Sequence, residues 1–172
     1  MPKRLLTVVV PVCTLGFATV LAAAVAFVLE PHDATTLLGV TALLAASTLA
    51  NRFPVPVEGV DSGGVSLSFV FGASALVLFG WEAGVLVAFA APAIMQLLEH
   101  RPPVRVAYNA SVLGLAAVVA GAAIAPLRGD GAAHLLLQVL VAAVAHFGVN
   151  LLLISLVVGI SAGKPFLTVA RK

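Results

Sequence analysis

Long apolar runs, separated by a handful of charged residues and by Gly/Pro clusters, constrain this sequence more than any other feature. The runs extend over residues 5–29, 34–50, 65–79, 83–98, 106–126 and 132–162. A helix that crosses the hydrocarbon core of a bilayer needs about 20 consecutive apolar residues, and most of these runs reach or approach that length. The sequence therefore predicts an all-α integral membrane protein with a bundle of six transmembrane helices.

The composition supports the same class of protein. Hydrophobic residues make up 62% of the chain and charged residues 9%, whereas soluble domains are about 45–50% apolar and about 25% charged. At about 20 residues per crossing, 172 residues hold no more than about six or seven spans. We therefore expect a single transmembrane domain over residues 1–172. The first run continues to Leu29, beyond the length of a signal-peptide core, so we expect a retained first helix.

The few basic residues predict the orientation. If the N-terminus is cytoplasmic and the helices alternate in direction, only Arg128 of the nine Lys and Arg residues falls outside. The positive-inside rule favours this arrangement over its inverse, so both termini are expected in the cytoplasm. The residues placed inside are Lys3, Arg4, Arg52, Arg101, Arg105, Lys164, Arg171 and Lys172.

Two connections carry turn signals. Gly80, followed by an interfacial Trp81, favours a turn between the third and fourth runs. The stretch His100–Asn109 combines Arg101 and Arg105 with the Pro102–Pro103 pair. We expect the prolines to separate two helices and the arginines to contact anionic lipids at the cytoplasmic surface.

The connection Asn51–Gly64 has a different pattern. Apolar residues alternate at Phe53, Val55 and Val57, and again at Val65, Leu67 and Phe69. This alternation predicts a short β-hairpin between the second and third helices, and it must lie at the interface or be covered by the bundle, because open sheet edges cannot face lipid. An extended loop without paired strands is the alternative.

Polar side chains at membrane depth are few, and such residues usually face the bundle interior. His146 and Asn150 lie one turn apart on one face of the last helix, and Asn109 is expected to approach Asn150. A polar cluster of this kind is suited to bind a small ligand or sense a proton. The alternative is that these groups only hold the helices together through hydrogen bonds. The candidate ligand-binding residues are Gln96, Asn109, Gln138, His146 and Asn150.

No enzyme motif is present. The sequence has no HExxH, GxSxG, P-loop or CxxC pattern. Cys13 stands alone in an apolar run, where it is expected to act as a small packing residue, and the histidines outside the last helix are too scattered for a metal site. We therefore expect no catalysis, no cofactor, no metal and no nucleic-acid partner.

Several segments resemble a known family: Val65–Phe71, Leu78–Gly80, Arg105–Asn109, Asn150 and Gly163–Pro165. They are similar to the membrane-associated sensory (MASE-like) domains that precede HD-GYP phosphodiesterases and GGDEF diguanylate cyclases in bacterial cyclic-di-GMP signalling proteins. The resemblance covers about residues 35–172. It implies a helical sensor of the bacterial cytoplasmic membrane, whose last helix continues into a cytoplasmic output domain.

The sequence departs from this pattern because it ends at Lys172 without HD, GYP or GGDEF residues. The chain is therefore expected to be either part of a longer signalling protein or a stand-alone relative. The expected partners are membrane lipids, a second copy of the chain, and an output domain or partner protein reached through Lys164–Lys172.

Two other functions stay open. Six helices with cytoplasmic termini also resemble the substrate-binding components of energy-coupling factor vitamin transporters, which dock their partner through small residues such as the row Ala18-Ala22-Ala26. Similar rows occur at Gly84-Ala88-Pro92 and Ala117-Gly121-Ala125. A pocket open near residues 30–33 and 80–83 would favour this transport function. The third function is that of a scaffold without a ligand.

Overall fold

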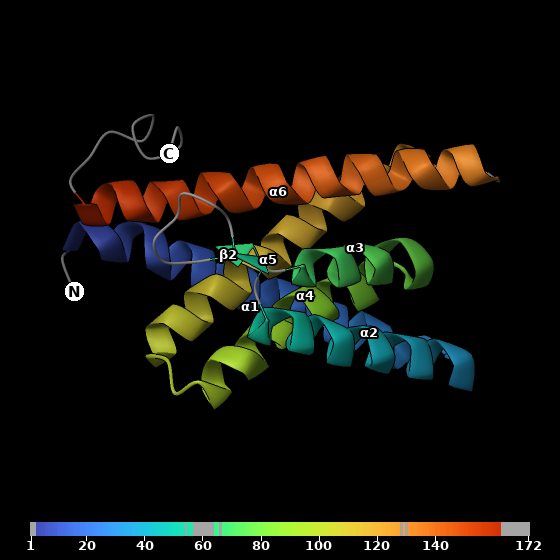
Figure 1. The fold of residues 1–172 in the computed structure, drawn as a ribbon, viewed down its shortest axis with the longest axis horizontal. Coiled ribbons are helices and arrows are strands. Elements are labelled where there is room, and N and C mark those ends of the chain that lie inside the picture. Colours follow the sequence, from blue (N-terminus) through green and yellow to red (C-terminus); the bar gives the residue numbers. More distant parts are fainter. Residues whose placement is uncertain are drawn as a thin grey trace.

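A computed structural model of the chain describes residues 3–53, 55–56, 64–65, 67–127, 129 and 131–162. These residues form six α-helices, the predicted number, and α1, α2 and α6 run along the long axis of the molecule (Figure 1). A 3-10 turn, Ala125–Leu127, continues α5. The helices are α1 (Lys3–Leu29), α2 (Ala34–Arg52), α3 (Ser68–Phe79), α4 (Trp81–Leu98), α5 (Pro103–Ile124) and α6 (Ala132–Ala162).

Five of these helices, all except α3, are long and apolar enough to cross a membrane, which is compatible with an integral membrane protein. The 12 residues of α3 extend for about 18 Å at 1.5 Å per residue, against a hydrocarbon thickness of about 30 Å. Ser47 Oγ donates a hydrogen bond to the carbonyl oxygen of Ser68 at 3.2 Å. The first residue of α3 therefore lies beside Ser47, more than a turn before the end of α2.

The predicted β-hairpin between α2 and α3 is reduced, among the described residues, to two segments of two residues each. In β1 (Val55–Pro56) and β2 (Gly64–Val65), Val55 pairs with Val65 in antiparallel register. Residues 57–63 and 66 lie outside the described part of the chain. The prediction that the second strand extends to Phe69 is wrong, because α3 begins at Ser68. In a helix, an apolar segment makes its backbone hydrogen bonds within itself, whereas a strand needs a neighbouring strand to make them.

Adjacent residues cap α1 and α2. The Nε2 atom of His32 hydrogen-bonds the carbonyl oxygen of Phe27 at 2.8 Å, and the His32 ring stacks on the Phe27 ring with centroids 4.0 Å apart. The Asp33 carboxylate accepts a hydrogen bond from the backbone N–H of Thr36 at 2.8 Å. A side-chain oxygen at this position satisfies an N–H that the first turn of a helix leaves free. The short connection of residues 30–33 thus fixes both helix ends.

The turns predicted at Gly80 and at Pro102–Pro103 form as expected. Gly80 joins α3 to α4 with φ +98°, a conformation that glycine adopts readily. At the end of α4, the backbone N–H groups of His100 and Arg101 donate to the carbonyl oxygens of Leu97 and Gln96 at 3.0 and 2.9 Å, which is a Schellman cap. Pro103 then begins α5, where no backbone N–H is required.

Small residues let the central helices approach closely. All three members of the Gly84-Ala88-Pro92 row are buried in α4, whereas Ala18 and Ala22 of the α1 row are exposed. The inner face of α1 is marked instead by Gly16, where an added Cβ would overlap the side chain of Ser111 on α5. The Gly84-Ala88-Pro92 row of α4 is therefore packed against neighbouring helices, whereas most of the Ala18-Ala22-Ala26 row of α1 faces outward.

Candidate functional site

The five polar residues predicted to bind a ligand lie in three separate places. The first place joins α4 to α5, where Asn109 Nδ2 donates a hydrogen bond to Gln96 Oε1 at 2.9 Å. Gln96 stands in the last turn of α4, and Asn109 stands in the second turn of α5, so the Pro102–Pro103 turn brings the two amides together. The pair lines a cavity of about 190 Å³.

Asn109 does not bond Asn150, although the sequence predicts that the two approach. Its neighbour Tyr108 faces α6 instead, and the Tyr108 hydroxyl donates to the carbonyl oxygen of Leu153 at 2.8 Å. Successive residues of an α-helix point about 100° apart, because 3.6 residues complete a turn. When Tyr108 faces α6, Asn109 is turned toward α4. No hydrogen bond links Asn109 to Asn150 within the described residues.

His146 and Asn150 form the second place, on the inner face of α6. One turn before His146, Ala142 packs with Leu76, Ala120 and Ile124, in what we call the Leu76 cluster. Beyond Asn150, Leu153 and Val157 pack against Val9, Val12, Tyr108 and Val112, the Tyr108 cluster. The His146 side chain and the Asn150 amide therefore interrupt an otherwise apolar seam between these two clusters.

The polar atoms of this pair are enclosed and unsatisfied. His146 is only 3% exposed. Its Nε2 atom and the Oδ1 atom of Asn150 have no hydrogen-bond partner among the residues that the structure describes. Buried polar groups are almost always hydrogen-bonded, so each exception calls for a physical explanation such as a water, an ion, a ligand or stored strain.

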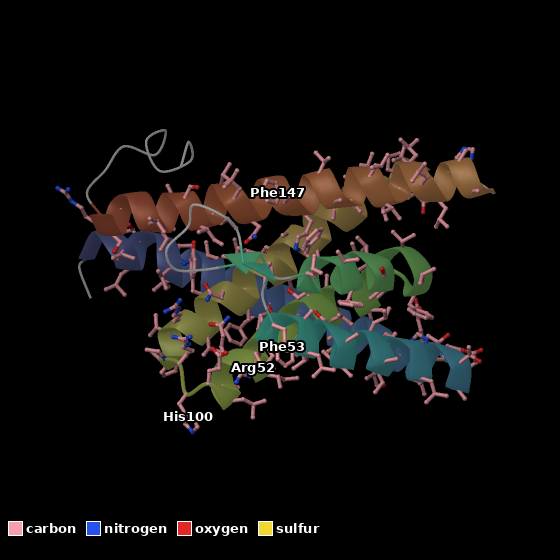
Figure 2. All side chains as sticks on the ribbon, in the orientation of Figure 1. Arg52, Phe53, His100 and Phe147 are labelled. Atoms are coloured by element: carbon pink, nitrogen blue, oxygen red, sulfur yellow. The ribbon has the colours of Figure 1, made fainter. Side chains whose placement is uncertain are left out.

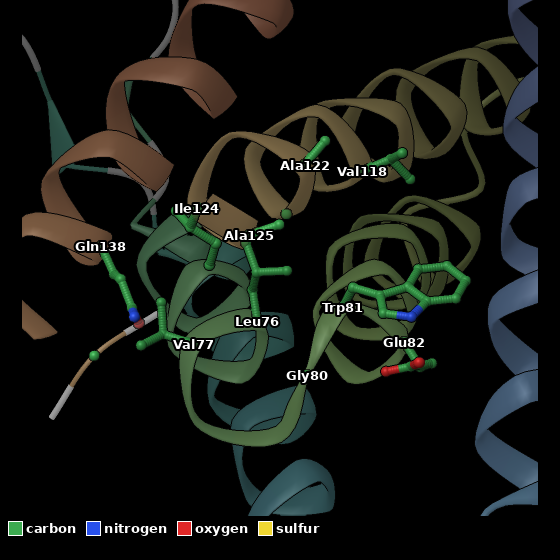
Figure 3. Close-up of a pocket in the computed structure, with 12 residues that line it drawn as sticks. Leu76, Val77, Gly80, Trp81, Glu82, Val118, Ala122, Ile124, Ala125 and Gln138 are labelled. Atoms are coloured by element: carbon green, nitrogen blue, oxygen red, sulfur yellow. The ribbon is translucent and has the colours of Figure 1, made fainter. Parts of the chain in front are cut away.

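Gln138, near the start of α6, lies in the third place. Its Nε2 atom donates to the carbonyl oxygen of Leu127 at 2.9 Å. It lines a cavity of about 790 Å³ where the α3–α4 turn, the end of α5 and the start of α6 meet (Figure 3). Figure 3 places the side chains of Trp81 and Glu82 on the opposite side from Gln138. The cavity has room for a small molecule, but these polar groups do not converge on one point.

Metal binding finds no support in the described ranges, which contain no group of three or more His, Cys, Asp or Glu residues placed to share an ion. Cys13 is a free, half-buried thiol. The bond from Tyr108 to Leu153 was not among the predicted site contacts. The chain has a single tyrosine, at the start of an apolar run. Because a buried tyrosine hydroxyl usually finds a hydrogen-bond partner, its position in the sequence could have indicated such a bond.

Comparisons of the chain with protein-family models, with curated proteins and with solved structures gave no match.

Proposed function

We propose that the chain is a six-pass sensory or input domain of a bacterial cytoplasmic membrane, which passes a change in helix packing through α6 to a cytoplasmic output domain or partner protein. One observation carries this proposal: His146 Nε2 and Asn150 Oδ1 are enclosed without a partner in the described chain. An unsatisfied polar group in an apolar interior costs free energy. A second packing arrangement, in which these atoms meet water, a ligand or another polar group, would recover that free energy, so a stimulus that favours it can shift the population.

The geometry of α6 suits it to carry such a change. Its 31 residues extend for about 46 Å, which exceeds the thickness of the hydrocarbon core, and it runs nearly the full length of the molecule (Figure 1). It packs along α5 and is attached to that helix at Leu153 by the Tyr108 hydroxyl. A rotation or shift at the level of His146 would move the end of α6, from which the chain continues to Lys164–Lys172.

The proposed topology has six crossings and both termini in the cytoplasm. Arg4, Arg52, Arg101 and Arg105 support it, because they stand at the start of α1, the end of α2 and the two ends of the α4–α5 turn. In this topology the third crossing leads from the end of α2 at Arg52 to the end of α3 at Phe79, and α3 itself provides about 18 Å of it.

The test joins a diguanylate cyclase domain after Lys172 and compares His146→Leu with the matched control Phe147→Leu, whose side chain is 60% exposed on α6. Leucine removes the unsatisfied ring and stabilises the packing described above. We expect His146→Leu to change nucleotide output by about fivefold or more, the usual lower range of coupling between sites, and Phe147→Leu to leave it unchanged. Equal output from both folded variants would reject the sensory proposal.

A transport function is the second candidate, and the cavity of about 790 Å³ beside Gly80, Trp81 and Glu82 favours it. The chain would then be a substrate-binding subunit similar to those of energy-coupling factor transporters. Filling the cavity by Gly121→Phe should abolish retention of a small molecule by the purified protein, measured by native mass spectrometry. If the unmodified chain retains no small molecule from growth medium or cell extract, this candidate function fails.

A further inference from the structure

A polar surface lies at the end of the bundle opposite the larger cavity, where α2 and α4 end and α5 begins. The cavity of about 190 Å³ in this place is lined by Gln96, Glu99, Arg101, Arg105 and Asn109, among others. At about 30 Å³ per water, it has the volume of about six water molecules. That is sufficient for a phosphate group together with some water.

The charges around this cavity are unbalanced. Glu99 is the one carboxylate among the lining residues, and its Oε2 atom accepts from Arg101 Nε at 3.0 Å. Arg105 forms no salt bridge with any described residue. Two guanidinium groups therefore face one carboxylate, and the cavity carries a net charge of +1. The terminal nitrogens of Arg101 and the whole Arg105 fork can still donate to an anion.

Amide donors surround the same space. Asn109 uses one hydrogen of its Nδ2 group to bond Gln96 Oε1, which leaves the second N–H of this group available. Gln96 accepts that bond with its oxygen and thereby orients its own NH₂ group. Planar guanidinium forks combined with neutral N–H donors match the several acceptor oxygens of a phosphate better than a single-oxygen ligand.

A second cavity of about 610 Å³ shares the walls formed by Met95, Glu99 and Arg101 and continues toward Arg52 and Leu49 of α2. Leu49 and Leu98 on its rim are 61% and 65% exposed. Figure 2 shows Arg52 on the same side of the bundle as His100. A small cationic cavity thus opens beside an apolar groove on the outer surface of the bundle.

We infer that this composite surface binds an anionic phospholipid, with the headgroup phosphate held by Arg101 and Arg105 and an acyl chain lying along Leu49 and Leu98. The apolar groove favours a lipid over free phosphate, since inorganic phosphate has no apolar part that could pack against Leu49 and Leu98. The inference rests on the proposed orientation, which brings these arginines to the level of the cytoplasmic headgroups.

The test adds phosphatidylglycerol, phosphatidylcholine or inorganic phosphate to the purified full chain in neutral detergent, and measures retained lipid by native mass spectrometry and thermal stability. We expect phosphatidylglycerol to be retained and to raise the melting temperature, and the other two probes to do neither. Arg105→Gln should weaken retention by about tenfold, the factor expected when one charged phosphate contact is lost. Arg4→Gln, at the same end but outside both cavities, should retain the lipid as the parent chain does.

Equal weakening by Arg105→Gln and Arg4→Gln would overturn the site, because it would indicate only general charge attraction. Stabilisation by inorganic phosphate alone would overturn the lipid as occupant. Helical content by circular dichroism identifies a variant that has failed to fold. In that case Arg105→Lys, which keeps the charge but loses the fork, provides the second comparison. Its lipid retention should lie between that of the parent chain and that of Arg105→Gln. The lipid measurement needs no output domain. A negative result would therefore leave the sensory proposal standing, and rejection of the sensory proposal would leave the lipid site standing.

Discussion

His100 occupies a backbone conformation that its side chain disfavours. Its φ of 55° places it in the left-handed region at the Schellman cap of α4, a position usually taken by glycine. A left-handed residue other than glycine costs about 1–2 kcal/mol. Figure 2 shows the imidazole extending away from the helices, so little packing would be lost on its removal. We expect His100→Gly to raise the free energy of unfolding in detergent by about 1 kcal/mol.

A matched control for this prediction is Gly131→Ala. Gly131 has φ +103° and no atom within 4 Å of the position that a Cβ would take, so the alanine adds backbone strain without a clash. This variant should lower the free energy of unfolding by about 1 kcal/mol. A stabilising Gly131→Ala or a destabilising His100→Gly would contradict the role assigned to the two turns.

Asp33 predicts a specific pH dependence of stability. Hydrogen bonds from the side chain and then the backbone N–H of Thr36 hold the pKa of its carboxyl below the ordinary value of 3.8. Since the folded-state pKa is the lower one, the contribution of Asp33 is complete above the unfolded pKa and is lost as the pH falls through the folded pKa.

An asparagine at this position would cap the helix comparably but would not titrate, so Asp33→Asn isolates this effect. The melting temperature of the parent chain relative to Asp33→Asn should be constant from about pH 7 to about pH 5 and should fall once the pH drops below the ordinary carboxyl pKa of 3.8. Circular dichroism of both proteins in the same detergent gives the measurement. A constant difference over the whole range would mean that Asp33 does not titrate with folding.

The contact between α4 and α5 can be tested through the Gln96–Asn109 bond. Each single replacement by leucine leaves one half-buried amide group without its partner, which costs at most the roughly 1–3 kcal/mol of a fully buried group. The double variant removes both groups, so the two losses should not add. We expect a coupling energy of about 0.5–1.5 kcal/mol, as for hydrogen bonds between membrane helices, from unfolding of the four proteins. Additive losses would mean that the bond contributes nothing to this contact.

The helices could be predicted from the sequence because each apolar run carries its own signal in length and in flanking Pro, Gly or charge. Pro102–Pro103 and Gly80 ended helices as expected, since their effect on the backbone is local. The partners of polar side chains could not be predicted, because they depend on the rotation of each helix. One residue of rotation separates Tyr108, which faces α6, from Asn109, which faces α4. Phe69 was misplaced in a strand because alternation over a few residues also fits an apolar helix.

The arrangement of the helices directs the ends that carry the described arginines toward the same half of the molecule (Figure 1). Arg4, Arg52, Arg101 and Arg105 stand at or beside helix ends that point the same way (Figure 1). The connection of residues 30–33 and the Gly80 turn lie toward the opposite end (Figure 1). A bilayer normal along the long axis would therefore place basic residues on one surface, as the positive-inside rule requires.

Cysteine labelling tests the six-crossing topology, and it is simple because Cys13 is the single cysteine. In a Cys13→Ala background, a membrane-impermeant maleimide on intact cells should modify Glu30→Cys and Trp81→Cys, and should modify Phe53→Cys and His100→Cys only after permeabilisation. The Phe53 and Trp81 positions flank the short α3, so they determine whether that segment crosses. If both react from the same side, residues 53–81 do not cross the membrane. The number of crossings is then five, and a cytoplasmic N-terminus would place Lys164–Lys172 outside the cell, where they could not reach a cytoplasmic output domain.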